Sequence, residues 1–190
     1  MGDDRRQITD PKALRALAHP VRWQLLEIVG REGSATATQC AQETGESVAN
    51  CSYHLNLLAK YNYVEKAEGG QGREKPWRLV SQSQQWSDLE MDTEGALAAQ
   101  AASGAFLEHA LTQIRDRHAA THAEAREWRA VVGIDNSNEY MTPAEVEELR
   151  VAVRAIMNKY EGRRLNPDLR PEGARFVNLF LSTTVAPEAD

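Results

Sequence analysis

The sequence predicts an α+β fold that is mainly helical, and three patterns in its 190 residues support this prediction. Two short helices separated by one glycine are expected at residues 36–61. A strand pair with a glycine-rich tip follows them, and a long alanine-rich helix comes next. These patterns divide the chain into residues 1–86, residues 87–128 with the long helix, and residues 129–190, which are expected to form a small α/β unit.

The overall composition is that of an ordinary globular protein, with 42% hydrophobic and 26% charged residues. No apolar run approaches the roughly 20 residues that cross a membrane, and residues 1–10 contain no secretory signal. Cys40 and Cys51 are too few for a disulfide framework, and we expect both to be small core residues. We therefore expect a cytoplasmic protein with no membrane partner.

The net charge of −6 is unevenly distributed along the chain. Residues 1–86 carry 11 Lys/Arg and 10 Asp/Glu, whereas residues 87–190 carry 11 Lys/Arg and 18 Asp/Glu. The acidity therefore belongs to the C-terminal half. The near-neutral N-terminal half can still present a local basic surface to a nucleic acid.

Capping residues define the two short helices. Thr36 and Gln39 form a capping box at the start of the first helix, and Gly45 supplies the left-handed residue that ends it. Ser47 then caps a second helix that runs to about Tyr61. The sequence therefore predicts two helices joined by a tight turn.

The second of these helices has an apolar side and a polar side. Its apolar residues recur at three- and four-residue spacing and predict a buried stripe of Val48, Cys51, Leu55 and Leu58. The residues outside this stripe are Asn50, Ser52, Tyr53, His54, Asn56 and Lys60. A helix with this polar face, held at an angle by a glycine turn, is typical of one that enters the DNA major groove.

The segments around this helix pair predict further elements. Residues 1–8 are expected to form a mobile polar arm. Asp10 and Pro11 open a helix, and Pro20 starts another that Gly33 ends. After the helix pair, residues 63–67 and 75–80 flank a glycine-rich loop, which predicts a β-hairpin. Basic residues lie on or beside this hairpin, namely Lys66, Arg73, Lys75 and Arg78.

These segments resemble the winged helix-turn-helix of the ArsR family of bacterial transcription regulators over residues 11–81. The resemblance rests on the His-Pro-x-Arg sequence at residues 19–22 and on Ser-x-His-Leu-x-x-Leu at residues 52–58. It implies a winged helix-turn-helix that binds double-stranded DNA, with repression as the default mode of action. It also implies a homodimer formed through helices that flank the winged domain.

The polar side chains of the second helix and the hairpin are the candidate DNA contacts. Amide and imidazole groups can read purine edges, and a ring can touch the thymine methyl, so we expect base contacts from Asn50, Ser52, Tyr53 and His54. Phosphate contacts are expected from Ser47, Lys60 and Arg73, because basic wing tips contact the backbone. The full set of candidates also includes Asn56 and Lys75.

The long helix is predicted to run from Glu94 to about Trp128 and is the candidate dimer element. An approximate four-three spacing along it is formed by Leu97, Ala101, Gly104, Leu107, Leu111, Ile114, His118 and Ala125. A dimer also suits DNA binding, because two copies of the polar-faced helix held about 34 Å apart reach the major groove at successive turns on one side of the duplex.

The last sixty or so residues predict two strands and a helix. Apolar runs predict strands at residues 130–134 and 176–181, and a capping box of Thr142 and Glu145 starts a helix that Gly162 ends. This small unit is expected to pack on the long helix or on its copy in a second subunit. An unknown small-molecule effector is expected to act there.

Two alternatives remain open from the sequence. A winged domain can also bind a protein partner instead of DNA. A metal- or redox-responsive sensor is the other alternative, with His118 and His122 or the two cysteines as its candidate ligands. The leading interpretation needs no cofactor and no bound metal. The sequence also contains no catalytic constellation, so we do not expect an enzyme.

Overall fold

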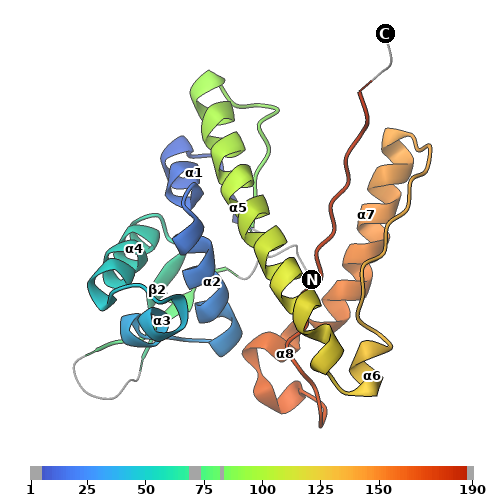
Figure 1. Cartoon of the computed structure of the whole chain (residues 1–190). Coiled ribbons are helices and arrows are strands. Elements are labelled where there is room, and N and C mark those ends of the chain that lie inside the picture. Colours follow the sequence, from blue (N-terminus) through green and yellow to red (C-terminus); the bar gives the residue numbers. More distant parts are fainter. Residues whose placement is uncertain (1–5, 69–73, 82–83, 188–190) are drawn as a thin grey trace.

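The computed structural model describes residues 6–68, 74–81 and 84–187 of the chain. In its N-terminal part the elements are β1 Arg6–Gln7, α1 Pro11–Leu17, α2 Pro20–Glu32, α3 Ala37–Thr44, α4 Val48–Lys60, β2 Val64–Lys66, β3 Trp77–Leu79 and β4 Gln84–Gln85 (Figure 1). The long helix α5 Thr93–Ala120 follows. Helices predominate and the antiparallel sheet is small, which confirms the mainly helical winged fold.

The two short helices begin and end as their capping residues predict. Thr36 Oγ1 accepts a hydrogen bond from the Gln39 backbone N–H at 3.2 Å, and the Gln39 side chain accepts from the Thr36 N–H at 2.8 Å. Gly45 has φ of 75°, a conformation that glycine adopts without strain, and it ends α3. Ser47 Oγ accepts from the Asn50 N–H at 3.1 Å and starts α4. The turn between the helices is thus fixed locally.

Helices α1 to α4 enclose one apolar core together with the start of the hairpin. Its largest fully buried side chains include Leu14, Leu17, Leu25, Val29, Leu55, Leu58 and Tyr63. Tyr63 also donates its hydroxyl hydrogen to the Ala13 carbonyl at 2.8 Å, which satisfies its one polar atom in the interior. Cys40 and Cys51 are fully buried in the same core, as predicted.

The predicted hairpin is formed by β2 and β3, which pair antiparallel with Glu65 opposite Arg78. Trp77 is buried and also bridges to Ala35, so the wing is attached to the start of the helix pair. The Lys66 ammonium lies 3.5 Å from the centre of the Trp77 ring, a cation–π contact at the base of the wing. The wing tip, with Arg73, lies outside the described residues.

The expectation of a mobile N-terminal arm is wrong from Arg6 onward. Strand β1 pairs in parallel with β4, which lies between the wing and the long helix. Ile8 is buried in the core and donates its backbone N–H to the Gln85 carbonyl at 2.9 Å. One apolar side chain among polar neighbours carries almost no periodic signal, so the sequence pattern did not reveal this anchor.

Helix α5 packs against α1 and α2 through small residues. Its buried positions are Gly95, Ala98, Ala99, Ala102 and Ala110. The helix ends at Ala120, before the predicted end near Trp128, and a 3₁₀ turn, Thr121–Ala123, and the short α6, Arg126–Arg129, follow. No helix in the described parts of the chain is long and apolar enough to cross a membrane.

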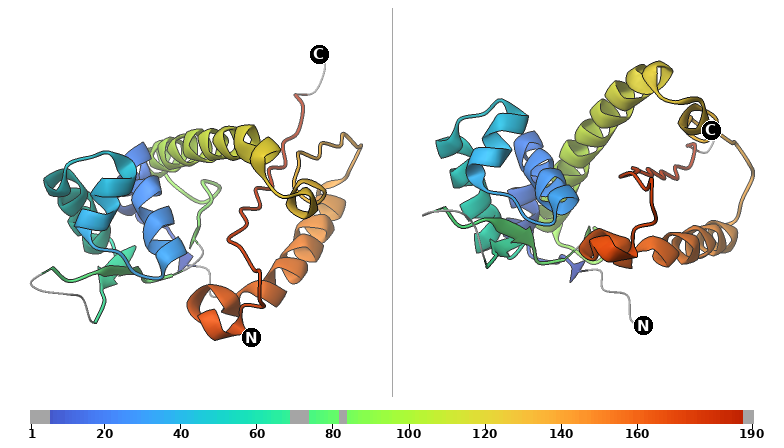
Figure 2. Two further views of the ribbon diagram at one scale, coloured as in Figure 1. Left: turned by 60° about the horizontal axis from the view of Figure 1, so that its bottom comes forward. Right: turned by 90° about the horizontal axis from the view of Figure 1, so that it is seen from below.

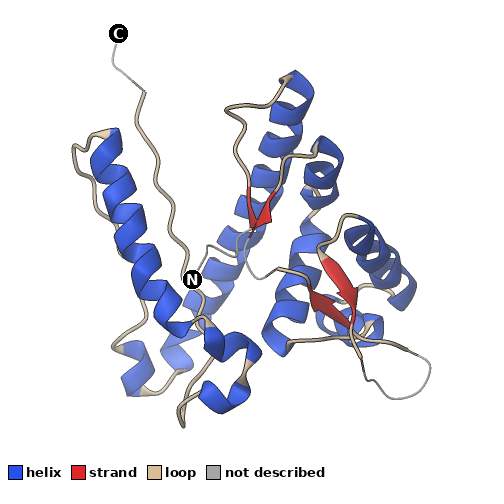
Figure 3. Cartoon of the chain, turned by 180° about the vertical axis from the view of Figure 1, so that it is seen from behind, coloured by secondary structure: helices blue, strands red, loops and turns tan. Residues whose placement is uncertain are grey.

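The predicted C-terminal α/β unit lacks its strands. Residues 130–131 form a turn after α6, residues 132–134 are irregular, and residues 176–181 make no ladder with any described strand. Figure 3 shows the strands, in red, only in the N-terminal half. A strand needs a partner to satisfy its backbone groups, and neither apolar run meets one among the described residues.

The helix of the C-terminal region forms with its predicted capping box. It is α7, Pro143–Met157, in which the Thr142 side chain accepts from the Glu145 N–H at 3.4 Å. It ends before Gly162, which instead begins the short α8, Gly162–Leu165. In the view of Figure 1, α7 lies on the other side of α5 from the winged domain, and Figure 2 shows α5 and α7 at an angle to each other, joined through α6 and the loop that follows it. The segment that follows reaches α5, where the Phe180 and Phe106 ring centres lie 6.3 Å apart.

Candidate nucleic-acid interface

Helix α4 presents one continuous face to solvent. Tyr53 is the most exposed large hydrophobic residue on it, at 62%, and Ala49, Asn56 and Lys60 are exposed on the same side. Side chains spaced three and four residues apart lie along one helix face, which is why these residues form a single row. Ser47 is exposed at the start of the row, and Asn50 and Ser52 are partly exposed beside it.

Two residues of α4 lie on the opposite side from the one predicted. Val48 is 46% exposed, so the buried stripe begins at Cys51 rather than at Val48. His54 is only 5% exposed and belongs to the interior. The helix is rotated slightly relative to the sequence pattern, because its phase is set by packing against α2 and α3.

The buried His54 is held by a buried arginine. Its Nδ1 accepts a hydrogen bond from Arg22 Nε at 3.2 Å, and Arg22 Nη1 donates to the Ala16 carbonyl at 2.8 Å. Burial lowers the pKa of His54, and the positive charge of Arg22 lowers it further. The expected base contact from His54 is therefore corrected, because the ring is covered and its acceptor nitrogen is occupied within the domain.

An aromatic stack connects this buried pair with the surface. The His19 ring centre lies 4.7 Å from that of His54, and the Tyr53 ring packs edge-on to His54 at 5.2 Å. His19 Nδ1 is buried and has no hydrogen-bond partner among the described residues. The motif residues His19, Arg22 and His54 thus support Tyr53 from beneath, a role that their polarity alone did not predict.

Two amide side chains of the α4 surface are already hydrogen-bonded within the protein. Asn50 Nδ2 donates to Glu46 Oε2 at 2.7 Å, and Asn56 Nδ2 donates to the Ser52 carbonyl at 2.7 Å. Asn50 must turn away from Glu46 to offer both amide groups to an adenine edge. Glu46 was not among the sequence candidates. Its position directly before the cap Ser47 could have shown that it lies beside the first turn of α4.

The wing contributes Lys75 as an exposed basic residue beside α3. Its neighbour Glu74 accepts hydrogen bonds from the Thr38 hydroxyl at 2.8 Å and from the Thr38 backbone N–H at 3.1 Å. These bonds hold the described part of the wing against the first turn of α3. Arg78 is paired with Glu65 at 2.6 Å across the hairpin.

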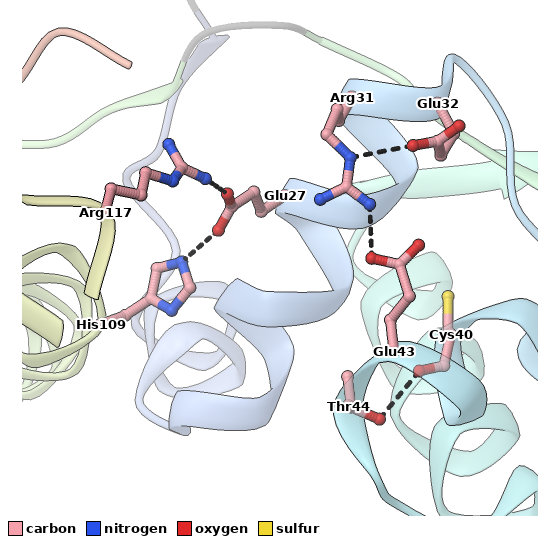
Figure 4. Close-up of polar contacts among 8 residues, drawn as sticks. All are labelled: Glu27, Arg31, Glu32, Cys40, Glu43, Thr44, His109 and Arg117. Atoms are coloured by element: carbon pink, nitrogen blue, oxygen red, sulfur yellow. Dashed lines mark hydrogen bonds and ion pairs between the residues drawn. The ribbon is translucent and has the colours of Figure 1, made fainter. Parts of the chain in front are cut away.

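A polar cluster attaches the long helix to the winged domain (Figure 4). Glu27 of α2 accepts from His109 Nε2 at 2.9 Å and pairs with Arg117, and both of these partners lie on α5. Burial opposes the charged form of Glu27, but the His109 hydrogen bond and the Arg117 charge outweigh it and lower the Glu27 pKa. The cluster therefore fixes the orientation of α5 relative to the helix pair.

A second ion pair connects α2 with α3, the first helix of the pair. Arg31 of α2 binds both Glu32, at 2.8 Å, and Glu43 of α3 (Figure 4). Thr44 donates its hydroxyl hydrogen to the Cys40 carbonyl at 2.8 Å near the end of α3. The Arg31–Glu43 pair joins α2 to α3, whereas the Thr44 hydrogen bond lies within α3.

The candidate metal and redox residues do not form a site. Burial raises the pKa of the Cys40 thiol to about 12, which disfavours the reactive thiolate. His118 lies on α5 but His122 lies in the 3₁₀ turn beyond it, where its Nδ1 is 2.7 Å from the Ala119 carbonyl oxygen. Among the described residues, no group of three or more His, Cys, Asp or Glu side chains could hold a metal.

Comparison with known proteins assigns one part of the chain. Residues 17–65 match the model of a family described as a helix-turn-helix domain, which spans α2, α3, α4 and the start of β2. No curated protein matches the chain. The match covers the geometry described above, in which α4 is the exposed second helix of the pair. It supports a DNA-binding regulator of the helix-turn-helix type and favours a regulator over an enzyme.

Proposed function

We propose that the protein is a sequence-specific, homodimeric transcription regulator of the ArsR type that represses by occluding a bacterial promoter. The observation that carries this proposal is the exposed face of α4, which lies in a helix-turn-helix domain and projects Tyr53 into solvent. A helix about 10–12 Å across fits the major groove, where side chains can reach base edges.

Base contacts in this proposal come from Asn50, Ser52 and Tyr53, with Asn56 further along the same face. Lys60 at the end of α4 and Lys75 on the wing neutralise phosphates, and Ser47 can donate its hydroxyl to one. Arg73 is proposed as a further phosphate contact at the wing tip. His54 is proposed to support Tyr53 from inside the domain.

A second copy of the chain is the proposed partner along α5. The side of α5 that points away from α1 exposes Leu97, Leu107 and Leu111, with the small Ala101 and Gly104 between them. Large apolar residues in a row on a fixed helix favour association, because pairing removes them from water. Two winged domains joined in this way would offer two α4 helices to one DNA face.

The acidic C-terminal region is proposed to adjust the separation of the two subunits. Helix α7 has no buried residue, although Val146, Leu149, Val153 and Ile156 recur on it at three- and four-residue spacing. Such an amphipathic helix is stable only when something covers its apolar side. A second subunit would cover it, and a small-molecule effector bound there would change the DNA affinity.

The experiment that tests the proposed function is recovery of genomic DNA fragments by the purified protein, followed by sequencing. The wild-type protein is expected to enrich a small set of sites with two similar half-sites. The Tyr53→Ala variant should lose this enrichment, whereas Tyr140→Ala, which removes a fully exposed ring in the loop before α7, should retain it. Equal enrichment by the Tyr53→Ala variant would contradict the proposal.

A second candidate function is a protein-binding winged domain. The exposed Val48 and Tyr53 on α4 favour it, because apolar and aromatic side chains are common at protein interfaces. Such a module would bind no duplex DNA even at low salt, which the same experiment detects. A thiol-based sensor is disfavoured by the buried cysteines and the raised Cys40 pKa.

A further inference from the structure

The first turn of α4 exposes apolar side chains where a recognition helix contacts base edges. Val48 is the first residue of the helix and is 46% exposed, and Ala49 beside it is exposed as well. In helix-turn-helix proteins the N-terminal residues of the second helix lie closest to the bases. We propose that Val48 and Ala49 read the methyl groups of thymines in the major groove.

The chemistry of the major groove points to this ligand. A valine side chain has no hydrogen-bond donor or acceptor, and the only apolar group that a base pair offers in the major groove is the thymine C5 methyl. Contact between the two removes apolar surface of both from water. Cytosine presents no methyl at this place, so the contact distinguishes A·T from G·C pairs.

The charged residues near the first turn are consistent with thymine rather than guanine. Guanine is read most often by a bidentate arginine or lysine, and residues 48–51 contain neither. The charged residue nearest to Val48 in the sequence is Glu46, whose carboxylate accepts a hydrogen bond from the Asn50 amide at 2.7 Å. Lys60 lies at the far end of the helix, where it faces a phosphate in the proposed complex.

The positions of these residues place the methyl contact beside the polar contacts. Ala49 and Tyr53 are four residues apart and share one side of α4, as do Val48 and Ser52. A thymine under the first turn would therefore neighbour the bases read by Ser52 and Tyr53. The inference rests on the proposed function, because it concerns the same helix and the same duplex.

The test combines a protein change with a DNA change. Duplexes are first selected from a randomised library by the wild-type protein, and their affinities are measured at one fixed salt concentration. Each thymine of the half-site is then replaced in turn by uracil, which deletes the methyl and keeps the hydrogen-bonding groups. The Val48→Ser variant is measured on the same duplexes, and Val151→Ser serves as a matched control, because Val151 is 52% exposed on α7.

The inference predicts that one or two uracil replacements weaken wild-type binding about fourfold each, the effect of one buried methyl group. Val48→Ser removes the contact from both subunits, so it should bind the thymine duplex more weakly than the wild type does and should no longer distinguish thymine from uracil. Val151→Ser should behave as the wild type does. Circular dichroism should show the same helix content for all three proteins.

Two other outcomes overturn the inference in different ways. Selective duplex binding that is insensitive to every uracil replacement, or equal thymine preference in Val48→Ser, would overturn the inference and leave the proposed function standing. Failure of the wild-type protein to select any duplex would overturn the proposed function and the inference with it.

Discussion

Arg22 of α2 donates a hydrogen bond from its Nε to Nδ1 of His54 on α4, at 3.2 Å, across 32 positions of sequence. Both side chains are buried, and no carboxylate pairs with Arg22 among the described residues. Its guanidinium is instead satisfied by the imidazole and by the carbonyls of Ala16 and Arg15, at 2.8 Å and 3.4 Å. The helix that carries Tyr53 is thus attached from inside the domain by a cation.

Removing this cation should destabilise the domain. Arg22→Ala leaves the Ala16 carbonyl and the His54 ring without this donor, whereas the Arg15 carbonyl still accepts the Ala18 N–H. An unsatisfied buried group costs about 1–3 kcal/mol. We expect the free energy of unfolding in urea to fall by about 2 kcal/mol. Arg126→Ala, on the exposed side of α6, is the control and should change little. Equal stability of the two variants would show that Arg22 does not hold α4.

The buried imidazole should make stability depend on pH. The pKa of His54 is lowered below 6.5 in the folded protein, chiefly by burial, so the unfolded chain binds more protons in the window between the two values. His54 therefore contributes stability above about pH 6.5 that is lost as the pH falls towards its folded pKa. Glu27 acts in a separate pH window. Its pKa is lowered from 4.5, so the stability that it contributes is lost only as the pH falls below about 4.5.

The measurement is urea unfolding of the wild type and of His54→Asn between pH 5 and 8. The asparagine can still accept from Arg22 but does not titrate in this range. Subtracting the two curves isolates the contribution of residue 54, which should decline on acidification. A difference that stays constant with pH would contradict the structural origin of the shift.

The Glu27 cluster should control how α5 is oriented. Glu27→Gln removes the charge that pairs with Arg117 and receives the His109 hydrogen bond. We expect a loss of about 1–2 kcal/mol in unfolding free energy and a weaker preference for one half-site spacing. Glu147→Gln, at an exposed pair with Arg150 at 3.4 Å, should leave both properties unchanged. If Glu27→Gln keeps the same preference for half-site spacing, the orientation of α5 does not determine that spacing.

The apolar row on α5 should determine the oligomeric state. Leu107→Glu combined with Leu111→Glu places two carboxylates in the proposed dimer contact, where burying them without partners is unfavourable. Sedimentation equilibrium should then give a monomer, and DNA affinity should fall because only one α4 engages. Leu89→Glu, at an exposed site before α5, is the control. A double variant that remains dimeric would assign the dimer contact elsewhere, for example to α7.

Local signals in the sequence predicted the elements well. The capping boxes at Thr36 and Thr142, the glycine at position 45 and the cap at Ser47 are all present in the structure as expected. Each of these features depends on residues only a few positions apart, so a short stretch of sequence is enough to predict it.

Features that depend on distant parts of the chain were predicted less well. The sides of α4 on which Val48 and His54 lie are decided by packing against α2, and the burial of His54 depends on Arg22. Ile8 is anchored by residues near position 85, and the apolar run at residues 176–181 pairs with no strand in the part of the chain that the structure describes. In each case the burial or pairing of a residue depends on a contact with a residue far away in the sequence.

The salt dependence of duplex binding tests the central claim most directly. Three basic contacts per subunit, from Lys60, Arg73 and Lys75, predict a slope of about −5 for log affinity against log salt in the dimer. Lys60→Gln should reduce the magnitude of this slope by about 2. No duplex binding at low salt, or an affinity that does not change with salt, would contradict the assignment of α4 as a DNA-reading helix.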